Sequence, residues 1–162
     1  MPKIGLDVGG VIITSGTSNR GDTSFDKGQH LNKPAVRGAV EAVQHLVEAY
    51  GVARVFIISK CGEATEAKTR EWLWHHSFYS KTGFDPDNLN FCRTREAKTP
   101  IAVGLELTHF VDDRSDVLGY MSGHVPNRYL FGPQSSDVLT ASATDCIHVP
   151  DWETCLRLLM KA

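Results

Sequence analysis

Short apolar blocks alternate along this chain with segments in which apolar residues recur every three or four positions. The blocks are of strand length, and several are rich in the β-branched residues that pack well in sheets. The block at 52–59 is almost continuously apolar, a pattern typical of a strand buried on both faces of a parallel sheet. We predict strands at 3–7, 52–59, 91–93, 108–111, 128–131 and 146–149.

The clearest helical pattern begins at Pro34 and stops before Gly51, because Pro is favoured in the first turn of a helix and Gly just past its end. One face of this helix carries Val36, Ala39, Val40, Val43, Leu46, Val47 and Tyr50. Further helices are predicted at 63–76, 95–105 and 115–121, and from Asp151 onward, where Asp151 is a plausible cap. In the helix at 63–76 the residues expected to face inward are Ala64, Ala67, Trp72 and Leu73.

This alternation predicts an α/β fold, a three-layer Rossmann-like open parallel sheet with helices on both faces. With 162 residues the chain suits one domain, 1–162, with no sizeable cap. Residues 14–33 show no periodicity, so we expect either a flap-like loop over whatever Asp7 holds or a disordered surface insertion. Residues 77–90 are rich in turn formers, and residues 132–145 are expected to form a polar loop.

The charge of the chain is nearly balanced, with 17 basic and 19 acidic residues and a net charge of −2. Such a chain has no basic field to hold nucleic acid or an anionic membrane, so we expect neither partner. The four cysteines contain no CxxC pair, which argues against a zinc site or a disulfide scaffold. Because the N-terminus does not resemble a signal peptide and no apolar run approaches a membrane span, we expect a soluble, cytoplasmic protein.

Polar residues follow three of the predicted strands at the point where each strand ends. Asp7 ends the first strand, Ser59 and Lys60 end the second block, and Asp112 and Asp113 end the strand at 108–111. In an open α/β sheet ligands bind at the carboxyl ends of the strands. Carboxylates that converge there repel one another unless a cation joins them, and Mg²⁺ favours carboxylate oxygens, water and a substrate phosphate. The pattern therefore predicts a magnesium site for a phosphorylated ligand.

Four motifs in this order resemble those of the haloacid dehalogenase (HAD) superfamily, which is dominated by phosphatases and phosphotransferases. The first is Leu6-Asp7-Val8-Gly9, the second is Phe56-Ile57-Ile58-Ser59, the third is the lone basic Lys98 and the fourth is Phe110-Val111-Asp112-Asp113. The resemblance covers nearly the whole chain. Each motif alone is common, whereas four in order at suitable spacing are fairly specific.

By this resemblance, Asp7 is the nucleophile that accepts a phosphoryl group, and Ser59 hydrogen-bonds a phosphate oxygen. Lys98 balances the charge of the nucleophile and the phosphate, and Lys60 is a further substrate-binding candidate. The metal ligands implied are Asp7, the backbone carbonyl of Gly9, Asp112 and Asp113. Asp116 is either a further carboxylate behind these residues or a solvated helix position. The implied cofactor is Mg²⁺, and the implied partner is a small phosphorylated molecule or a phosphoprotein.

The first motif departs from the family pattern, because Gly9 stands where hydrolytic members carry a second Asp. That carboxylate protonates the leaving oxygen and later activates water, and such a group contributes about 10²- to 10⁴-fold to the rate. The residues and the resemblance together predict a magnesium-dependent phosphohydrolase that is slow on ordinary alkyl phosphates.

Three functions are compatible with this departure. The first is a phosphohydrolase whose acid comes from Asp22, Asp26 or His30, or whose leaving group needs none, as in an acyl or aryl phosphate. The second is a non-catalytic binding or regulatory protein on the same fold. The third is a relative of the dehalogenase or phosphonatase type, which the missing cap disfavours.

Overall fold

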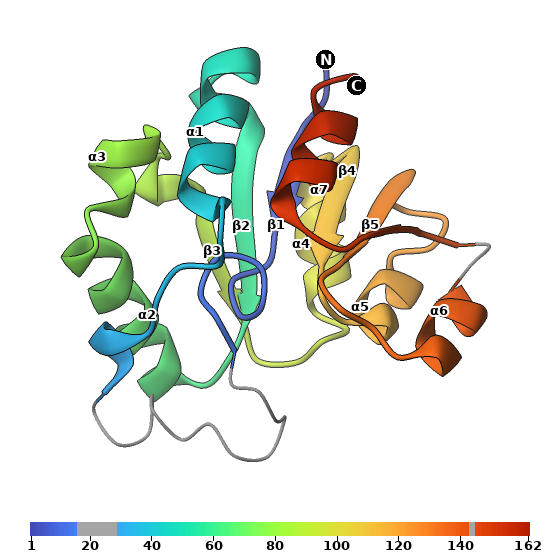
Figure 1. The fold of residues 1–162 in the computed structure, drawn as a ribbon, viewed down its shortest axis with the longest axis horizontal. Coiled ribbons are helices and arrows are strands. Elements are labelled where there is room, and N and C mark those ends of the chain that lie inside the picture. Colours follow the sequence, from blue (N-terminus) through green and yellow to red (C-terminus); the bar gives the residue numbers. More distant parts are fainter. Residues whose placement is uncertain (16–28, 143–144) are drawn as a thin grey trace.

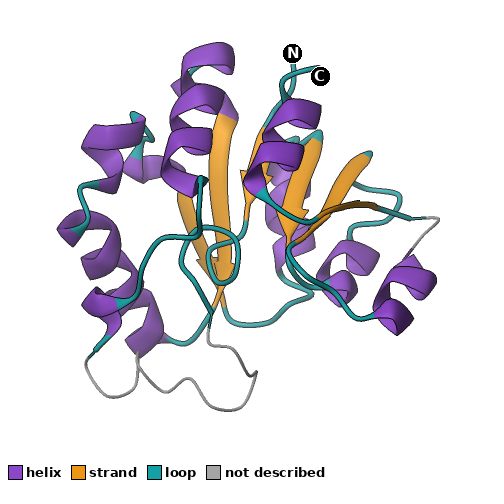
Figure 2. Cartoon of the chain, in the orientation of Figure 1, coloured by secondary structure: helices purple, strands orange, loops and turns teal. Residues whose placement is uncertain are grey.

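The computed structural model describes residues 1–15, 29–142 and 145–162. Within these residues six strands form one sheet in the order β3-β2-β1-β4-β5-β6, and every neighbouring pair is parallel (Figures 1 and 2). The strands are β1 (Ile4–Leu6), β2 (Val55–Lys60), β3 (Leu89–Cys92), β4 (His109–Asp112), β5 (Asn127–Phe131) and β6 (Ile147–Val149). The predicted α/β, Rossmann-like fold is confirmed.

Helices cover both faces of the sheet, which gives three layers (Figure 1). The α-helices are α1 (Ala39–Tyr50), α2 (Glu63–His75), α3 (Phe78–Thr82), α4 (Lys98–Gly104), α5 (Ser115–Tyr120), α6 (Ser136–Ser142) and α7 (Trp152–Leu159). Three short 3-10 helices are η1 (His30–Asn32), η2 (Val52–Arg54) and η3 (Pro86–Asn88). None of the helices in the described part of the chain is long and apolar enough to cross a membrane.

Two apolar cores lie on opposite faces of the sheet, because successive side chains of a strand point to opposite faces. In β2, Ile57 belongs to the core beneath α1, α2, α3 and α7, whereas Phe56 and Ile58 belong to the core beneath α4 and α5. All three side chains are buried, so the prediction that this strand is buried on both faces is confirmed.

The helix predicted to open at Pro34 begins five residues later, at Ala39. The intervening backbone is held elsewhere, since Ala35 forms an isolated bridge with Ile13 and the N–H of Val36 donates to the carbonyl of Ile12 at 2.7 Å. Gly38, with a φ of 80°, then turns the chain into the helix. The helical spacing of apolar residues in the sequence therefore begins several residues before the helix itself, which starts at Ala39.

Three further expectations were wrong. In α2 the side chains of Ala64 and Ala67 are exposed, whereas Trp72 and Leu73 are buried as predicted, together with Thr69. The segment 77–90, expected to be turns, contains α3, which buries Phe78 and Thr82. The segment expected to be a polar loop contains α6, from which Val138 and Leu139 pack against the second core. Such short helices depend on tertiary contacts more than on their own sequence.

The last helix secures the turn that follows β1. Asp151 caps α7 as predicted, accepting a hydrogen bond from the N–H of Thr154 at 2.8 Å. The buried indole of Trp152 packs against Phe131 and donates to the carbonyl of Val11 at 2.7 Å. The C-terminal helix therefore holds the backbone just beyond Asp7.

We expect Trp152→Phe to lower the free energy of unfolding by about 1–3 kcal/mol, because the buried carbonyl of Val11 loses its donor. Urea unfolding followed by circular dichroism measures this loss. Trp74→Phe is the matched control, since Trp74 is 79% exposed and its replacement should change stability little. Equal stability of the two variants would contradict the anchoring role of Trp152.

Candidate functional site

The chain order reverses between β1 and β4, which are neighbours in the sheet although they are far apart in sequence. Leu6 lies opposite Val111, so Asp7 and Asp112 leave the sheet at the same level. The N–H of Asp7 donates to the carbonyl of Val111 at 3.0 Å and extends the ladder by one step. A crevice outside the carboxyl ends of such strands is the usual ligand site of open α/β sheets.

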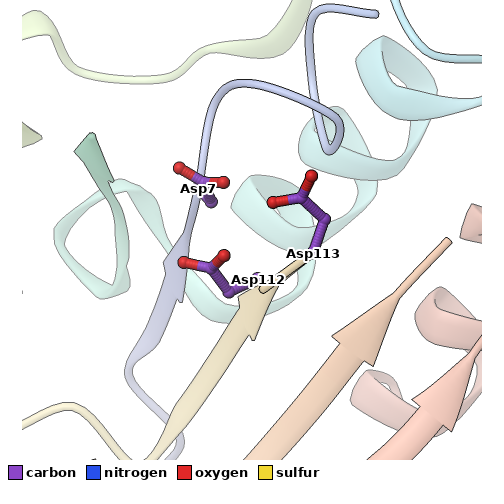
Figure 3. Close-up of side chains that lie close together, drawn as sticks. All are labelled: Asp7, Asp112 and Asp113. Carbon is purple, nitrogen blue, oxygen red and sulfur yellow. The ribbon is translucent and has the colours of Figure 1, made fainter. Parts of the chain in front are cut away.

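Three carboxylates gather at this point. Asp7, Asp112 and Asp113 each offer one oxygen, and these oxygens all lie within 4.8 Å of one another. Figure 3 shows Asp7 beyond the end of β1 and the two other acids at the end of β4. Asp112 is completely buried, Asp7 nearly so and Asp113 partly. The structure thus brings together the three acidic residues that the sequence singled out.

Lys98 joins two of these acids. Its Nζ donates to Oδ1 of Asp7 at 2.9 Å and to Oδ2 of Asp112 at 2.8 Å, and its side chain is only 3% exposed. Burial opposes the positive charge, but the carboxylates of Asp7 and Asp112 outweigh it and raise the pKa of the Lys98 ammonium above its ordinary value. Lys98 is therefore a permanent cation within the acid cluster.

One lysine does not balance three carboxylates. Burial, followed by the charge of Asp7, raises the pKa of Asp112 to about 7, although Lys98 opposes this shift. Burial, the charges of Asp7 and Asp112, and hydrogen bonding with both raise the pKa of Asp113 to about 8. Without a metal the cluster therefore retains protons near neutral pH, and a divalent cation could replace them.

The donor set and its spacing suit Mg²⁺. Carboxylate oxygens are its preferred protein ligands, and two ligands on opposite sides of the ion, each about 2.1 Å from it, are about 4.2 Å apart. The oxygens of Asp7, Asp112 and Asp113 lie within 4.8 Å of one another, which is close to that separation. Water and a substrate phosphate would complete the coordination, as they usually do for this ion.

A tight turn after β1 shapes one side of the cluster. The N–H of Ile12 donates to the carbonyl of Val8 at 2.8 Å, and the N–H of Gly10 donates to the carbonyl of Ile13 at 2.8 Å. Gly10 has a φ of 78°, and a Cβ atom there would overlap the carboxylate of Asp113. Glycine at position 10 is therefore required both by the backbone and by the neighbouring acid.

Gly9 differs from its neighbour. Its φ lies outside the left-handed range, it is exposed, and a Cβ atom built on it would meet nothing within 4 Å. The backbone therefore does not demand glycine at position 9, and a side chain would fit there.

The remaining predicted residues lie at the same edge of the sheet but outside the cluster. Ser59 is buried near the end of β2, the strand next to β1, and the exposed Lys60 follows it. Within the described part of the chain no hydrogen bond or ion pair links either residue to the three acids. Their contact with a phosphate stays a prediction.

Three residues of the predicted loop, Asp22, Asp26 and His30, were candidates to replace the missing carboxylate. Asp22 and Asp26 lie outside the described residues. His30 is buried, and its Nε2 lies 2.7 Å from Oε2 of Glu71 on α2. The imidazole is therefore engaged with α2, and no hydrogen bond or ion pair among the described residues links it to the three acids.

Sequence reasoning missed two residues that hold the acids in place. The backbone N–H of Arg114 donates to Oδ1 of Asp112 at 3.0 Å. The side-chain amide of Gln134 donates to the backbone carbonyls of Asp113 at 2.8 Å and Phe131 at 3.1 Å. The position of Arg114 after two acids is a weak signal for the first contact, and no signal points to the second. Asp116 stays outside the cluster, paired with the guanidinium groups of Arg114 and Arg95.

A cleft of about 900 Å³ opens beside the cluster. It shares Gly10 and Asp113 with the cluster and extends past Phe131 toward Asp151 at the start of α7. Of the three acids, Asp113 therefore lines a larger solvent-accessible space, which can admit more than a phosphate group.

Comparison of the sequence with models of known protein families gave no match, and comparison with curated proteins found no similar sequence.

We expect the free energy of unfolding of the metal-free protein to fall as the pH rises from about 5 to about 8. The folded state binds protons on Asp112 and Asp113 more tightly than the unfolded state, where the pKa is near 3.8. The stability that these protons provide is therefore present at low pH and lost as the pH passes the raised pKa values. Urea unfolding in the presence of a chelator, repeated across this range, measures the slope.

Asp113→Asn is the control for this slope, because the amide removes one titrating group and keeps its size. Its stability should depend less on pH than that of the wild type. A variant slope as steep as the wild-type slope would show that the titration lies elsewhere in the chain.

Proposed function

We propose that this protein is a magnesium-dependent phosphohydrolase of the HAD type, in which Asp7 forms an aspartyl phosphate. One observation carries the proposal: three acids at the carboxyl ends of β1 and β4 converge at the point where the strand order reverses, with a buried lysine between two of them. The four sequence motifs, which stand in the order typical of that superfamily, support it. The substrate is a phosphorylated compound, either a small molecule or a phosphorylated protein.

The reaction follows from the placement of the groups. A carboxylate oxygen of Asp7 attacks the phosphorus atom, the bond to the leaving oxygen breaks, and the phosphoryl group moves to Asp7. Water then attacks the same phosphorus, the bond between phosphorus and the Asp7 oxygen breaks, the proton of the water goes to the released phosphate or to bulk water, and the carboxylate is restored. Two such displacements replace one more difficult step.

Lys98 supplies the electrostatic support for this chemistry. Its ammonium group is fixed 2.9 Å from Oδ1 of Asp7. The positive charge is therefore already in place to stabilise the negative charge that develops on the phosphoryl group during transfer. Asp112 holds the other side of Lys98, while Asp113 and Asp112 would bind Mg²⁺ together with Asp7 and the Gly9 carbonyl. The ion would supply charge neutralisation at the phosphate oxygens.

Gly9 favours a restricted range of substrates. With no carboxylate at this position, the departing oxygen must leave without a protein acid, which suits an acyl or aryl phosphate and slows an alkyl phosphate. The same observation favours the second candidate function, a protein that binds a phosphorylated ligand without turning it over. Catalytic turnover distinguishes the two functions.

We expect hydrolysis of p-nitrophenyl phosphate and acetyl phosphate that requires Mg²⁺ and is lost, by about 10³-fold or more, in Asp7→Asn. The amide has the size of the acid but cannot act as the nucleophile. Steady-state phosphate release measures the rate. Asp87→Asn is the control, because Asp87 lies in η3, which precedes the outermost strand β3 and is therefore at the amino ends of the strands, away from the acid cluster.

Wild-type protein that binds phosphate with Mg²⁺ but hydrolyses neither compound would support the binding protein instead. Turnover that survives in Asp7→Asn would exclude Asp7 as the nucleophile.

Gly9→Asp should raise the rate on an alkyl phosphate such as glycerol phosphate by about tenfold or more. The side chain has space, and the new carboxyl group can protonate the leaving oxygen. The rate on p-nitrophenyl phosphate should rise much less, because nitrophenolate leaves without a proton. Gly9→Asn is the matched control of similar size without the acid, and equal rates in the two variants would refute this account of position 9.

A further inference from the structure

The cleft beside the acid cluster is lined by one arginine that makes no hydrogen bond or ion pair within the described part of the chain. Arg37 and Arg114 both line this space. The guanidinium of Arg114 binds both carboxylate oxygens of Asp116 at 3.1 Å, so it is already neutralised. Arg37 is exposed and makes no hydrogen bond or ion pair with any residue in the described ranges.

The charge of Arg37 acts on the carboxylate of Asp151, but Asp151 is hydrogen-bonded to another residue. The carboxylate of Asp151 accepts a hydrogen bond from the N–H of Thr154 as the cap of α7. This bond, together with weaker effects of Arg157 and Arg37, lowers the pKa of Asp151. Arg37 therefore influences Asp151 at a distance but keeps its five donors available to a ligand.

The cleft is larger than a phosphate group requires. Its volume of about 900 Å³ falls in the range of about 300–1,000 Å³ typical of small-molecule sites. Asp113 and Gly10 bound one end, whereas Arg37 and Val36 contribute to the wall that precedes α1. A ligand whose phosphate lies on the Asp113 side of the acid cluster would therefore have its remaining atoms in the cleft.

We infer that this cleft binds the leaving group of the substrate and that Arg37 pairs with a second anionic group on it. The substrate class is a small organic phosphate with a further carboxylate or phosphate. This inference rests on the proposed function, because it places the phosphate at the acid cluster. An arginine suits the task, since its planar fork matches the two oxygens of a carboxylate or phosphate.

Binding of non-hydrolysable ligands tests the inference without turnover. The probes are phosphonocarboxylates of increasing chain length, each paired with the alkylphosphonate that lacks only the carboxylate, titrated by calorimetry into protein with Mg²⁺. For at least one chain length the carboxylate should tighten binding by about tenfold. Arg37→Gln should abolish this gain and leave the affinity for alkylphosphonates unchanged.

Two further variants separate a specific contact from a general charge effect. Arg157→Gln makes the same change of charge, also near Asp151, but outside the lining of the cleft, so the gain should persist. Arg37→Lys keeps the charge without the fork and should retain part of the gain.

The possible failures are distinct. If alkylphosphonates bind with Mg²⁺ but the carboxylate adds nothing at any length, or its gain survives Arg37→Gln, the inference about Arg37 is wrong and the proposed function stands. If neither phosphate nor any phosphonate binds in the presence of Mg²⁺, the proposed function and the inference both fail.

Discussion

A buried ammonium group between two carboxylates organises the carboxyl edge of this sheet. Lys98 reaches Asp7 on one side and Asp112 on the other, with almost no exposure to water. Removing one member of such a group leaves an uncompensated buried charge, which costs about 3–5 kcal/mol, whereas the intact group adds little net stability over an apolar replacement. The cluster is therefore poorly explained as a stabilising device and well explained as the means of holding two acids ready at a ligand site.

The sheet makes this arrangement possible with very short strands. β1 has only three residues, all completely buried or nearly so, and it pairs with β2 on one side and β4 on the other. Its end is therefore fixed from both sides, and the hydrogen bond from Asp7 to Val111 fixes the first residue beyond it. The turn that follows is held by the indole of Trp152, so elements from both ends of the described chain constrain the environment of Asp7.

Part of this site could be predicted from the sequence, and the reasons are physical. An acid that ends an apolar strand is costly unless it has a partner, so Asp7 and the pair Asp112–Asp113 were recognisable as one site once an open parallel sheet was expected. The pairing of β1 with β4 was beyond the pattern of the chain, because apolar blocks do not specify their neighbours. Lys98 followed only from the family resemblance, since a single lysine within a helical pattern carries no signal of its own.

The contacts that were missed involve backbone groups or short elements. The N–H of Arg114 donates to the carboxylate of Asp112, and the side-chain amide of Gln134 donates to the backbone carbonyl of Asp113. Because each contact involves a backbone group, the sequence pattern does not indicate it. Gln134 also precedes α6, a helix in which only Val138 and Leu139 pack against the core. A helix with so few apolar contacts has too weak a pattern to be distinguished from a loop.

The adjacent glycines of the first turn show why position matters more than composition. Gly10 is fixed by its positive φ and by the carboxylate of Asp113, so no other residue would leave the cluster intact. Gly9 has neither constraint, and its backbone would accept an acid. The lack of a carboxyl group at position 9 is therefore not a consequence of folding. In the proposed function, Asp7, Asp112, Asp113 and Lys98 would hold the phosphoryl group, and the missing carboxyl group at position 9 would remove only the capacity to protonate a poor leaving group.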